Sequence, residues 1–225
     1  MRLVTTCPMR FYQDNAVFSW IGQELLRCDT PLMLKELPFL KSTSTVAKSA
    51  RAVGKIDMVL VHPDTEHLRW CALEMQAVYF SGRSLSSELR DLQKWKGPGL
   101  PFPKYQRRPD FRSSGPKRLM PQLQIKVPTL SRWGKKIAVV IDHAFWLSLG
   151  QMLEVSDKSN CDIAWFVVDY EESKGSHSLC PHSLHLTTLD RAVEGLTGGI
   201  PTSLGDFEAA LRARLPADQP PRQAT

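Results

Sequence analysis

The chain has 225 residues, of which 42% are hydrophobic and 23% are charged, so it can bury a core and is not disordered as a whole. Its net charge of +6 modestly favours a polyanionic partner. No apolar run reaches the roughly 18 residues of a membrane span, and the N-terminus lacks the apolar core of a secretory signal. We therefore expect a cytoplasmic protein that does not enter a membrane.

The five cysteines are an odd number at irregular spacing, and no CxxC pair occurs. A disulfide framework and a self-contained tetrahedral zinc site are therefore not expected. His177, His182 and His185, together with Cys180, could suggest a metal cluster, but no pair has a recurrent ligand spacing. We interpret this stretch as a polar surface loop.

Apolar residues at helical spacing predict a helix over 15–28, with Asn15 as its N-cap. Residues 31–40 predict a strand that Pro38 interrupts. The following stretch, 41–55, is polar, small and basic, which is typical of an exposed loop.

Two apolar segments, 56–62 and 68–80, predict strands close enough in sequence to form a hairpin. Residues 84–96 predict a helix with leucines and a tryptophan on one stripe. From 97 to 128 the chain is rich in proline and cations with little periodicity, and we interpret it as a long irregular segment that could lie along a groove.

Further apolar strands are predicted at 136–142 and 162–170. A helix is predicted over 203–215, opened by Ser203 in a capping-box pattern. Residues 216–225 should be a disordered tail. Strands and helices in this mixture predict an α/β domain with a mixed central sheet flanked by helices.

Two polar side chains project from the middle of an apolar strand. Because alternate residues of a strand share a face, Glu74 and Gln76 point the same way. The hairpin would bring Asp57 beside Glu74, and two neighbouring carboxylates suit a hard cation such as Mg²⁺. On spacing alone, a solvated face of an antiparallel strand is the simpler interpretation.

An acid that opens one strand, followed by Glu-x-polar on the next, resembles the pattern of the PD-(D/E)xK nucleases. The segments GKIDMVLVH and WCALEMQAVYFSG resemble the NotI family of type II restriction endonucleases, whose motif ends in Gln. Residues 107–142, the segment TCPMRF and DIAWFVVDYEE at 162–172 resemble the same family. The resemblance covers roughly residues 5–172.

The resemblance implies a restriction-endonuclease-like core and Mg²⁺-dependent cleavage of double-stranded DNA by a homodimer, at a G·C-rich palindromic site. It implies one nuclease domain over 1–215, with a catalytic hairpin at 54–82 and a basic DNA-binding segment at 83–136. Carried over by position, Asp57 and Glu74 become metal ligands, with the Met75 carbonyl as a third. Gln76 then orients the attacking water or the scissile phosphate.

The family also uses an upstream acid, for which Glu36 is the first candidate and Glu24 the second. An ordinary exposed strand residue is an equal interpretation of Glu36. Family members carry a cysteine-rich metal site upstream of the segment that resembles TTCPMRF. The chain keeps only Cys7 of that region, so we do not expect it to build this cluster from its own N-terminus.

Charge is unevenly distributed along the chain. Fourteen lysines and arginines and three acids lie between residues 83 and 136, a net +11, so the rest carries −5 of the total +6. Such a basic block is typical of phosphate binding. Candidate contacts to phosphate or guanine are Arg107, Arg108, Arg112, Lys117 and Arg118. Because they alternate, Gln122, Gln124 and Lys126 are expected to share a face towards DNA.

Three functions remain open on the sequence. The first is a site-specific type II restriction endonuclease. The second is a catalytically impaired DNA-binding protein of the same fold, and the third is a DNA nuclease of relaxed specificity.

Overall fold

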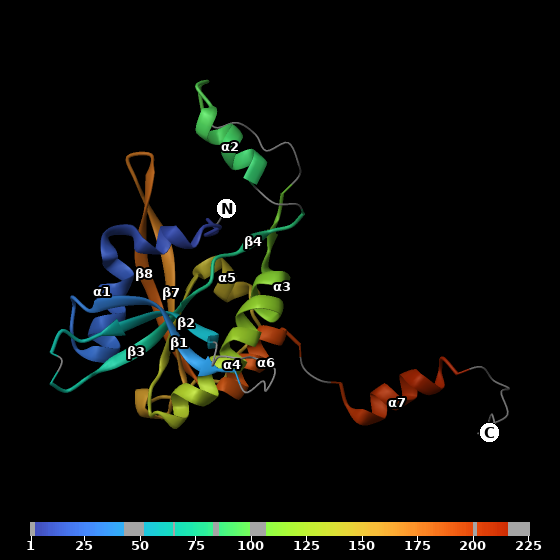
Figure 1. Ribbon diagram of the computed structural model, residues 1–225. Helices are drawn as coiled ribbons and strands as arrows, with labels where there is room; N and C mark the ends of the chain where they lie inside the picture. Colours follow the sequence, from blue (N-terminus) through green and yellow to red (C-terminus); the bar gives the residue numbers. More distant parts are fainter. Residues whose placement is uncertain are drawn as a thin grey trace.

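The computed structural model describes residues 3–42, 52–64, 66–82, 86–99, 107–199 and 202–215. In this part of the chain, six strands form a mixed sheet between two layers of helices (Figure 1), and two further strands form a small second sheet. This is the predicted α/β class. The strands are β1 (Leu32–Lys41), β2 (Ala52–Val61), β3 (Trp70–Met75), β4 (Tyr79–Phe80), β5 (Pro109–Asp110), β6 (Ile137–Asp142), β7 (Ile163–Ser173) and β8 (Ser176–Thr187).

The helical elements are α-helices and shorter turns of 3-10 or π type. The α-helices are α1 (Ala16–Ile21), α2 (Ser86–Lys94), α3 (Phe111–Ser114), α4 (Met120–Arg132), α5 (His143–Ser148), α6 (Leu189–Thr197) and α7 (Leu204–Arg212). The turns are η1 (Pro8–Asn15), η2 (Gly22–Leu26), η3 (Gly115–Leu119) and η4 (Lys158–Asn160).

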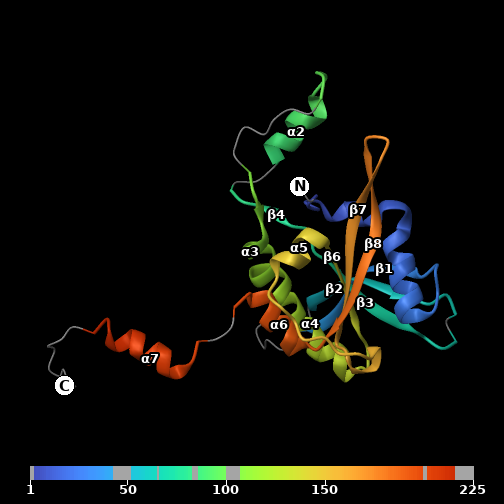
Figure 2. The same ribbon diagram turned by 180° about the vertical axis from the view of Figure 1, so that it is seen from behind.

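The large sheet has the strand order β1-β2-β3-β6-β7-β8. Its centre, β3-β6-β7, is parallel, and the outer pairs β1-β2, β2-β3 and β7-β8 are antiparallel. All six residues of β6 are buried, which is typical of a central strand covered on both faces. The hairpin β7-β8 extends past the end of the sheet (Figure 2).

Each face of the sheet has its own hydrophobic core. On one face, α4, α5 and α6 pack through residues such as Leu123, Phe145 and Leu196. On the other face, η1, α1 and η2 pack through residues such as Phe11 and Ile21. The strand alternation therefore directs Ala72 and Val78 towards α4 and the odd-numbered residues of β3 towards α1.

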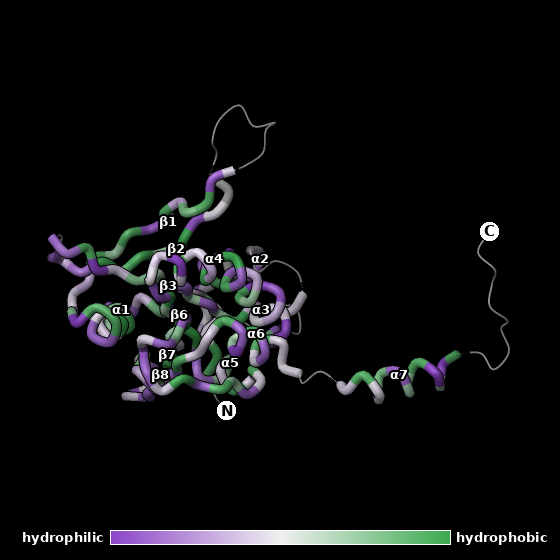
Figure 3. The backbone as a smooth tube through the Cα atoms, turned by 90° about the horizontal axis from the view of Figure 1, so that it is seen from below, coloured by the Kyte–Doolittle hydropathy of each residue, from purple (hydrophilic) through white to green (hydrophobic). Residues whose placement is uncertain are grey.

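β1 is an edge strand, which explains why Pro38 is tolerated inside it. Its apolar residues, including Leu32 and Leu34, border an apolar hollow of about 410 Å³ that continues over β2 to Trp133. The predicted helix at 203–215 is present as α7, where the Ser203 hydroxyl accepts a hydrogen bond from the Asp206 amide at 3.1 Å. α7 lies apart from the sheet, and no residue of it is buried (Figure 3).

The predicted helix at 15–28 is present as α1 and η2, but Asn15 is not its side-chain cap. Asn15 has a left-handed backbone (φ 54°) and makes no capping hydrogen bond, because η1 leads directly into α1. The predicted helix at 84–96 is present as α2. Residues 43–51 of the predicted loop and the predicted tail at 216–225 lie outside the described residues.

The predicted strand at 68–80 is too long. β3 ends at Met75, and the Val78 amide instead donates to the Thr5 carbonyl at 2.8 Å. The N-terminal segment thus takes the hydrogen bonds that a continued strand would have used. Tyr79 then pairs with Asp110 in the second sheet.

The prediction of irregular structure over 97–128 is wrong from residue 111 onward. There α3, η3 and α4 follow one another without a gap. Pro116 lies in η3, and Pro121 and Pro128 lie in α4, so this helical stretch lacks an amide hydrogen at these three positions. The predicted polar loop around 177–185 is also wrong, because β8 occupies it as an edge strand with a largely exposed face.

Candidate active site

The antiparallel pairing of β2 with β3 brings the two candidate carboxylates together. Met58 pairs with Leu73, so the next pair in the same register is Asp57 with Glu74. Glu74 is 6% exposed, whereas the side chain of Asp57 is 64% exposed. One carboxylate therefore lies deep in the protein and the other lies at its surface.

A lysine from α4 joins these carboxylates. The Lys126 ammonium donates to Glu74 Oε2 at 2.6 Å and to Asp57 Oδ2 at 3.1 Å. Lys126 is itself only 2% exposed. A buried ammonium is costly without a counter-charge, and here two carboxylates supply it.

Burial dominates the ionisation of Glu74. It raises the pKa of Glu74 to about 7, although the charge of Lys126 acts in the opposite direction. The neighbouring charge of Asp57 raises it further. Any cation that takes a place between these groups stabilises the ionised pair, so the site favours positive charge.

The carboxylates open into a cavity of about 450 Å³. Its lining includes Asp57, Glu74, Gln76, Lys117, Arg118 and Gln122. Gln76 is 8% exposed, and its amide donates to the Ala77 carbonyl at 2.6 Å. Met75 also lines the cavity, at the end of β3.

The structure separates the two candidates for the upstream acid. Lys35 pairs with Met58 and Leu37 with Ile56, so Glu36 lies across β1-β2 from Asp57. Glu36 has a left-handed backbone (φ 56°) and pairs with Lys55 at 2.7 Å.

That hydrogen bond and the charge of Lys55 lower the pKa of Glu36, while the charge of Asp57 opposes them. Glu24 instead pairs with Lys158 beside a different cavity. The structure thus places Glu36, and not Glu24, next to Asp57.

The prediction that Gln122, Gln124 and Lys126 share a face is wrong, because these residues lie in the helix α4. In a helix, Gln122 and Lys126 lie four residues apart on one face, whereas Gln124 points elsewhere. Gln122 lines the cavity, Lys126 binds the carboxylates and Gln124 is exposed to solvent. A stripe at helical spacing, Leu119, Leu123, Val127 and Leu130, could have revealed this helix, but the prolines between its members concealed it.

The arginines and lysines predicted to contact DNA differ in their surroundings. Lys117 and Arg118 line the cavity, and the Arg118 guanidinium stacks 3.7 Å above the Tyr79 ring. Arg108 and Arg112 are exposed outside it.

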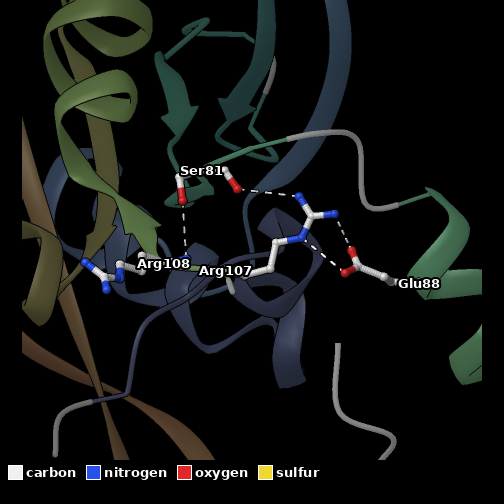
Figure 4. A network of polar contacts seen from close by, with 4 residues as sticks. All are labelled: Ser81, Glu88, Arg107 and Arg108. Atoms are coloured by element: carbon white, nitrogen blue, oxygen red, sulfur yellow. Dashed lines mark hydrogen bonds and ion pairs between the residues drawn. The ribbon is translucent and has the colours of Figure 1, made fainter. Parts of the chain in front are cut away.

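Arg107 departs from the prediction of a DNA contact. Its side chain is 4% exposed and pairs with Glu88 of α2, with Nε to Oε1 at 3.2 Å (Figure 4). It also donates to the Ser81 carbonyl at 3.4 Å. Arg107 therefore links α2 to the second sheet. Its guanidinium is buried, and such a group needs a carboxylate partner.

The donor set fits a divalent cation. Two carboxylates that converge on one ammonium have their oxygens directed at a common positive charge, and hard oxygen ligands are those that Mg²⁺ prefers.

Within the described residues, no helix is long and apolar enough to span a membrane.

A mixed sheet thus carries paired acids on a hairpin, beside a cavity with cationic residues in its wall. A protein-family model described as restriction endonuclease NotI matches residues 1–179. The chain belongs to this family and is an endodeoxyribonuclease, a restriction enzyme that hydrolyses double-stranded DNA. The family generally needs a divalent metal. A comparison with curated protein sequences found no match.

Proposed function

We propose that the protein is a Mg²⁺-dependent, site-specific type II restriction endonuclease whose catalytic residues are Asp57, Glu74 and Gln76, with Glu36 as the supporting upstream acid. The observation that carries the proposal is the convergence of Asp57 and Glu74 on one cation at the edge of a cavity with basic walls. The retained pair argues against a protein that only binds DNA, because two acids near phosphates weaken binding unless they hold a cation.

Held by Asp57, Glu74 and the Met75 carbonyl, Mg²⁺ would supply Lewis acidity and an activated water for hydrolysis. Gln76 can hydrogen-bond a water or a phosphate oxygen, but its amide cannot accept the water's proton at neutral pH. Lys126 orients both carboxylates, because its ammonium donates to one oxygen of each. Its charge also favours the ionised form of Glu74, against the effect of burial. It is a positioning residue in this proposal.

Lys117 and Arg118 are the proposed phosphate contacts nearest the carboxylates, since both line the cavity. Arg108, Arg112 and Gln124 are exposed and are proposed to contact DNA outside the cavity. Arginine and glutamine can read the major-groove edges of guanine and adenine, which is compatible with a G·C-rich palindromic site. Symmetric cleavage of such a site would need two active sites, hence a homodimer.

A plasmid digest with Mg²⁺ or with EDTA tests the proposal. Discrete fragments that disappear in EDTA support it, a smear indicates relaxed specificity, and retarded but uncut DNA indicates a binding protein. Asp57→Asn and Glu74→Gln should abolish cleavage and keep DNA binding. Glu24→Gln is the matched control, because Glu24 pairs with Lys158 at another cavity and should cut normally. Normal cleavage by either of the first two variants would contradict the assignment.

A further inference from the structure

A second group of metal-ligating side chains lies on the other half of the sheet, where α5 begins beside the β7-β8 hairpin. His143 opens α5, Asp169 lies in β7 and His182 lies in β8. Each offers one ligand atom, and these atoms all lie within 4.8 Å of one another. The nuclease chemistry uses none of them.

A β-bulge directs His182 into this cluster. Val167 pairs with Ser183 and Val168 with Pro181, which leaves His182 as the additional residue of β8. Bulges re-aim a side chain and occur beside functional sites. Here the His182 ring stacks on the His143 ring, with centroids 3.8 Å apart.

The three side chains are connected and accessible. His143 Nδ1 lies 2.9 Å from Asp169 Oδ2. The side chains of His143 and Asp169 are 14% and 32% exposed, and His182 is exposed. An ion can therefore enter from solvent and keep water as a further ligand.

The donor atoms of the cluster suit a cation. Two imidazoles and one carboxylate are a ligand set found at protein zinc sites.

We propose that His143, Asp169 and His182 bind one divalent transition-metal ion, with Zn²⁺ as the first choice. Ligands in a tetrahedral zinc site lie about 3.4 Å apart at normal bond lengths, so the cluster must tighten. The exposed His182 ring can turn out of its stack to do so. A bound ion would tie the start of α5 to the β7-β8 hairpin.

This tie also supports a wall of the nuclease cavity. Asp142, directly before His143, accepts a hydrogen bond from the Thr5 amide at 2.5 Å. The Thr5 hydroxyl lies 2.6 Å from that of Tyr170, which follows Asp169. The next residue, Thr6, lines the cavity.

The test is a Zn²⁺ titration of the metal-free full chain by calorimetry, with thermal unfolding as a second measurement. All titrations use full chains that carry Glu74→Gln, so that the nuclease carboxylates do not take up a second ion. We expect one zinc ion per chain and a zinc-dependent rise in unfolding temperature. Asp169→Asn and His182→Ala should each weaken zinc binding by about tenfold or more. Because His182 is exposed, its substitution should leave the fold intact.

One control excludes the other exposed group of possible ligands among the described residues. His67→Ala removes the group formed by Asp64, Glu66 and His67 and should bind zinc like its Glu74→Gln parent. Absence of zinc binding in that parent, unchanged binding in His182→Ala and Asp169→Asn, or loss of the bound zinc in His67→Ala would overturn the proposal.

Discussion

Replacing Lys126 with methionine tests the charge arrangement of the site. Methionine keeps the volume of the lysine stem but removes the ammonium that pairs with Asp57 and Glu74. Removing one partner of a buried ion pair typically costs about 3–5 kcal/mol, because it leaves the other charge uncompensated. Glu74 can avoid part of this cost by taking up a proton, since burial already raises its pKa to about 7.

The loss of stability should therefore depend on pH. Near pH 6 the Glu74 carboxyl of the Lys126→Met variant is protonated, so little stability is lost. Each further pH unit should cost about 1.4 kcal/mol until the full penalty of the uncompensated charge is reached. Urea denaturation in EDTA, followed by tryptophan fluorescence, measures this difference between variant and wild type.

Ca²⁺ should stabilise Lys126→Met more than the wild type, because the ion no longer competes with an ammonium for the carboxylates. The control is Lys55→Met, whose pair with Glu36 is exposed and should contribute little to stability. The reasoning would be refuted if Lys126→Met lost no free energy of unfolding relative to the wild type, or lost the same amount at pH 6 and at pH 9.

Four further results are expected. Burial raises the pKa of Glu74 from 4.5 to about 7, so the contribution of Glu74 to the free energy of unfolding of the metal-free protein should fall as the pH rises from 4.5 to 7. In Glu74→Gln, the free energy of unfolding measured by urea denaturation should depend less on pH over this range. Arg107→Ala should lower the free energy of unfolding by about 3 kcal/mol, because it leaves Glu88 unpaired; an unchanged urea midpoint would contradict this. Arg118→Ala should instead weaken DNA binding and reduce its salt dependence, measured by fluorescence anisotropy, with unfolding unchanged. Gly22→Ala should destabilise the protein by more than about 1 kcal/mol in thermal unfolding, since a Cβ there would lie 2.2 Å from the Cys28 carbonyl oxygen.

The sequence predicts the β2-β3 hairpin because its signals are local. Apolar segments at 56–62 and 68–80 predict both strands, although the second ends at Met75, and the short connection between them favours an antiparallel pair. The position of Asp57 beside Glu74 follows directly. What the sequence cannot provide is the partner from another element, since Lys126 is separated from Glu74 by 52 residues.

Two errors have the same physical origin. The prolines of residues 97–128 suggest a loop, although Pro116, Pro121 and Pro128 lie within helical turns. The polar residues of β8 suggest a loop, although an edge strand needs only one covered face. In both cases tertiary packing outweighs local composition, and in both the missed element carries a residue of a proposed site: the positioning residue Lys126 on α4 and the proposed zinc ligand His182 on β8.

The π turn η3 determines which residues of α4 face the candidate active site. A π turn holds one residue more than the α-helical turn it replaces, so it sets the rotational phase of everything that follows in α4. Deleting a single residue from Gly115–Leu119 would rotate Gln122 and Lys126 by about 100° around the helix axis. The amino acids of the site would all remain in the chain, yet the ammonium would face another direction. Under the proposed function, we expect such a one-residue deletion to abolish cleavage while Asp57, Glu74 and Gln76 stay unchanged.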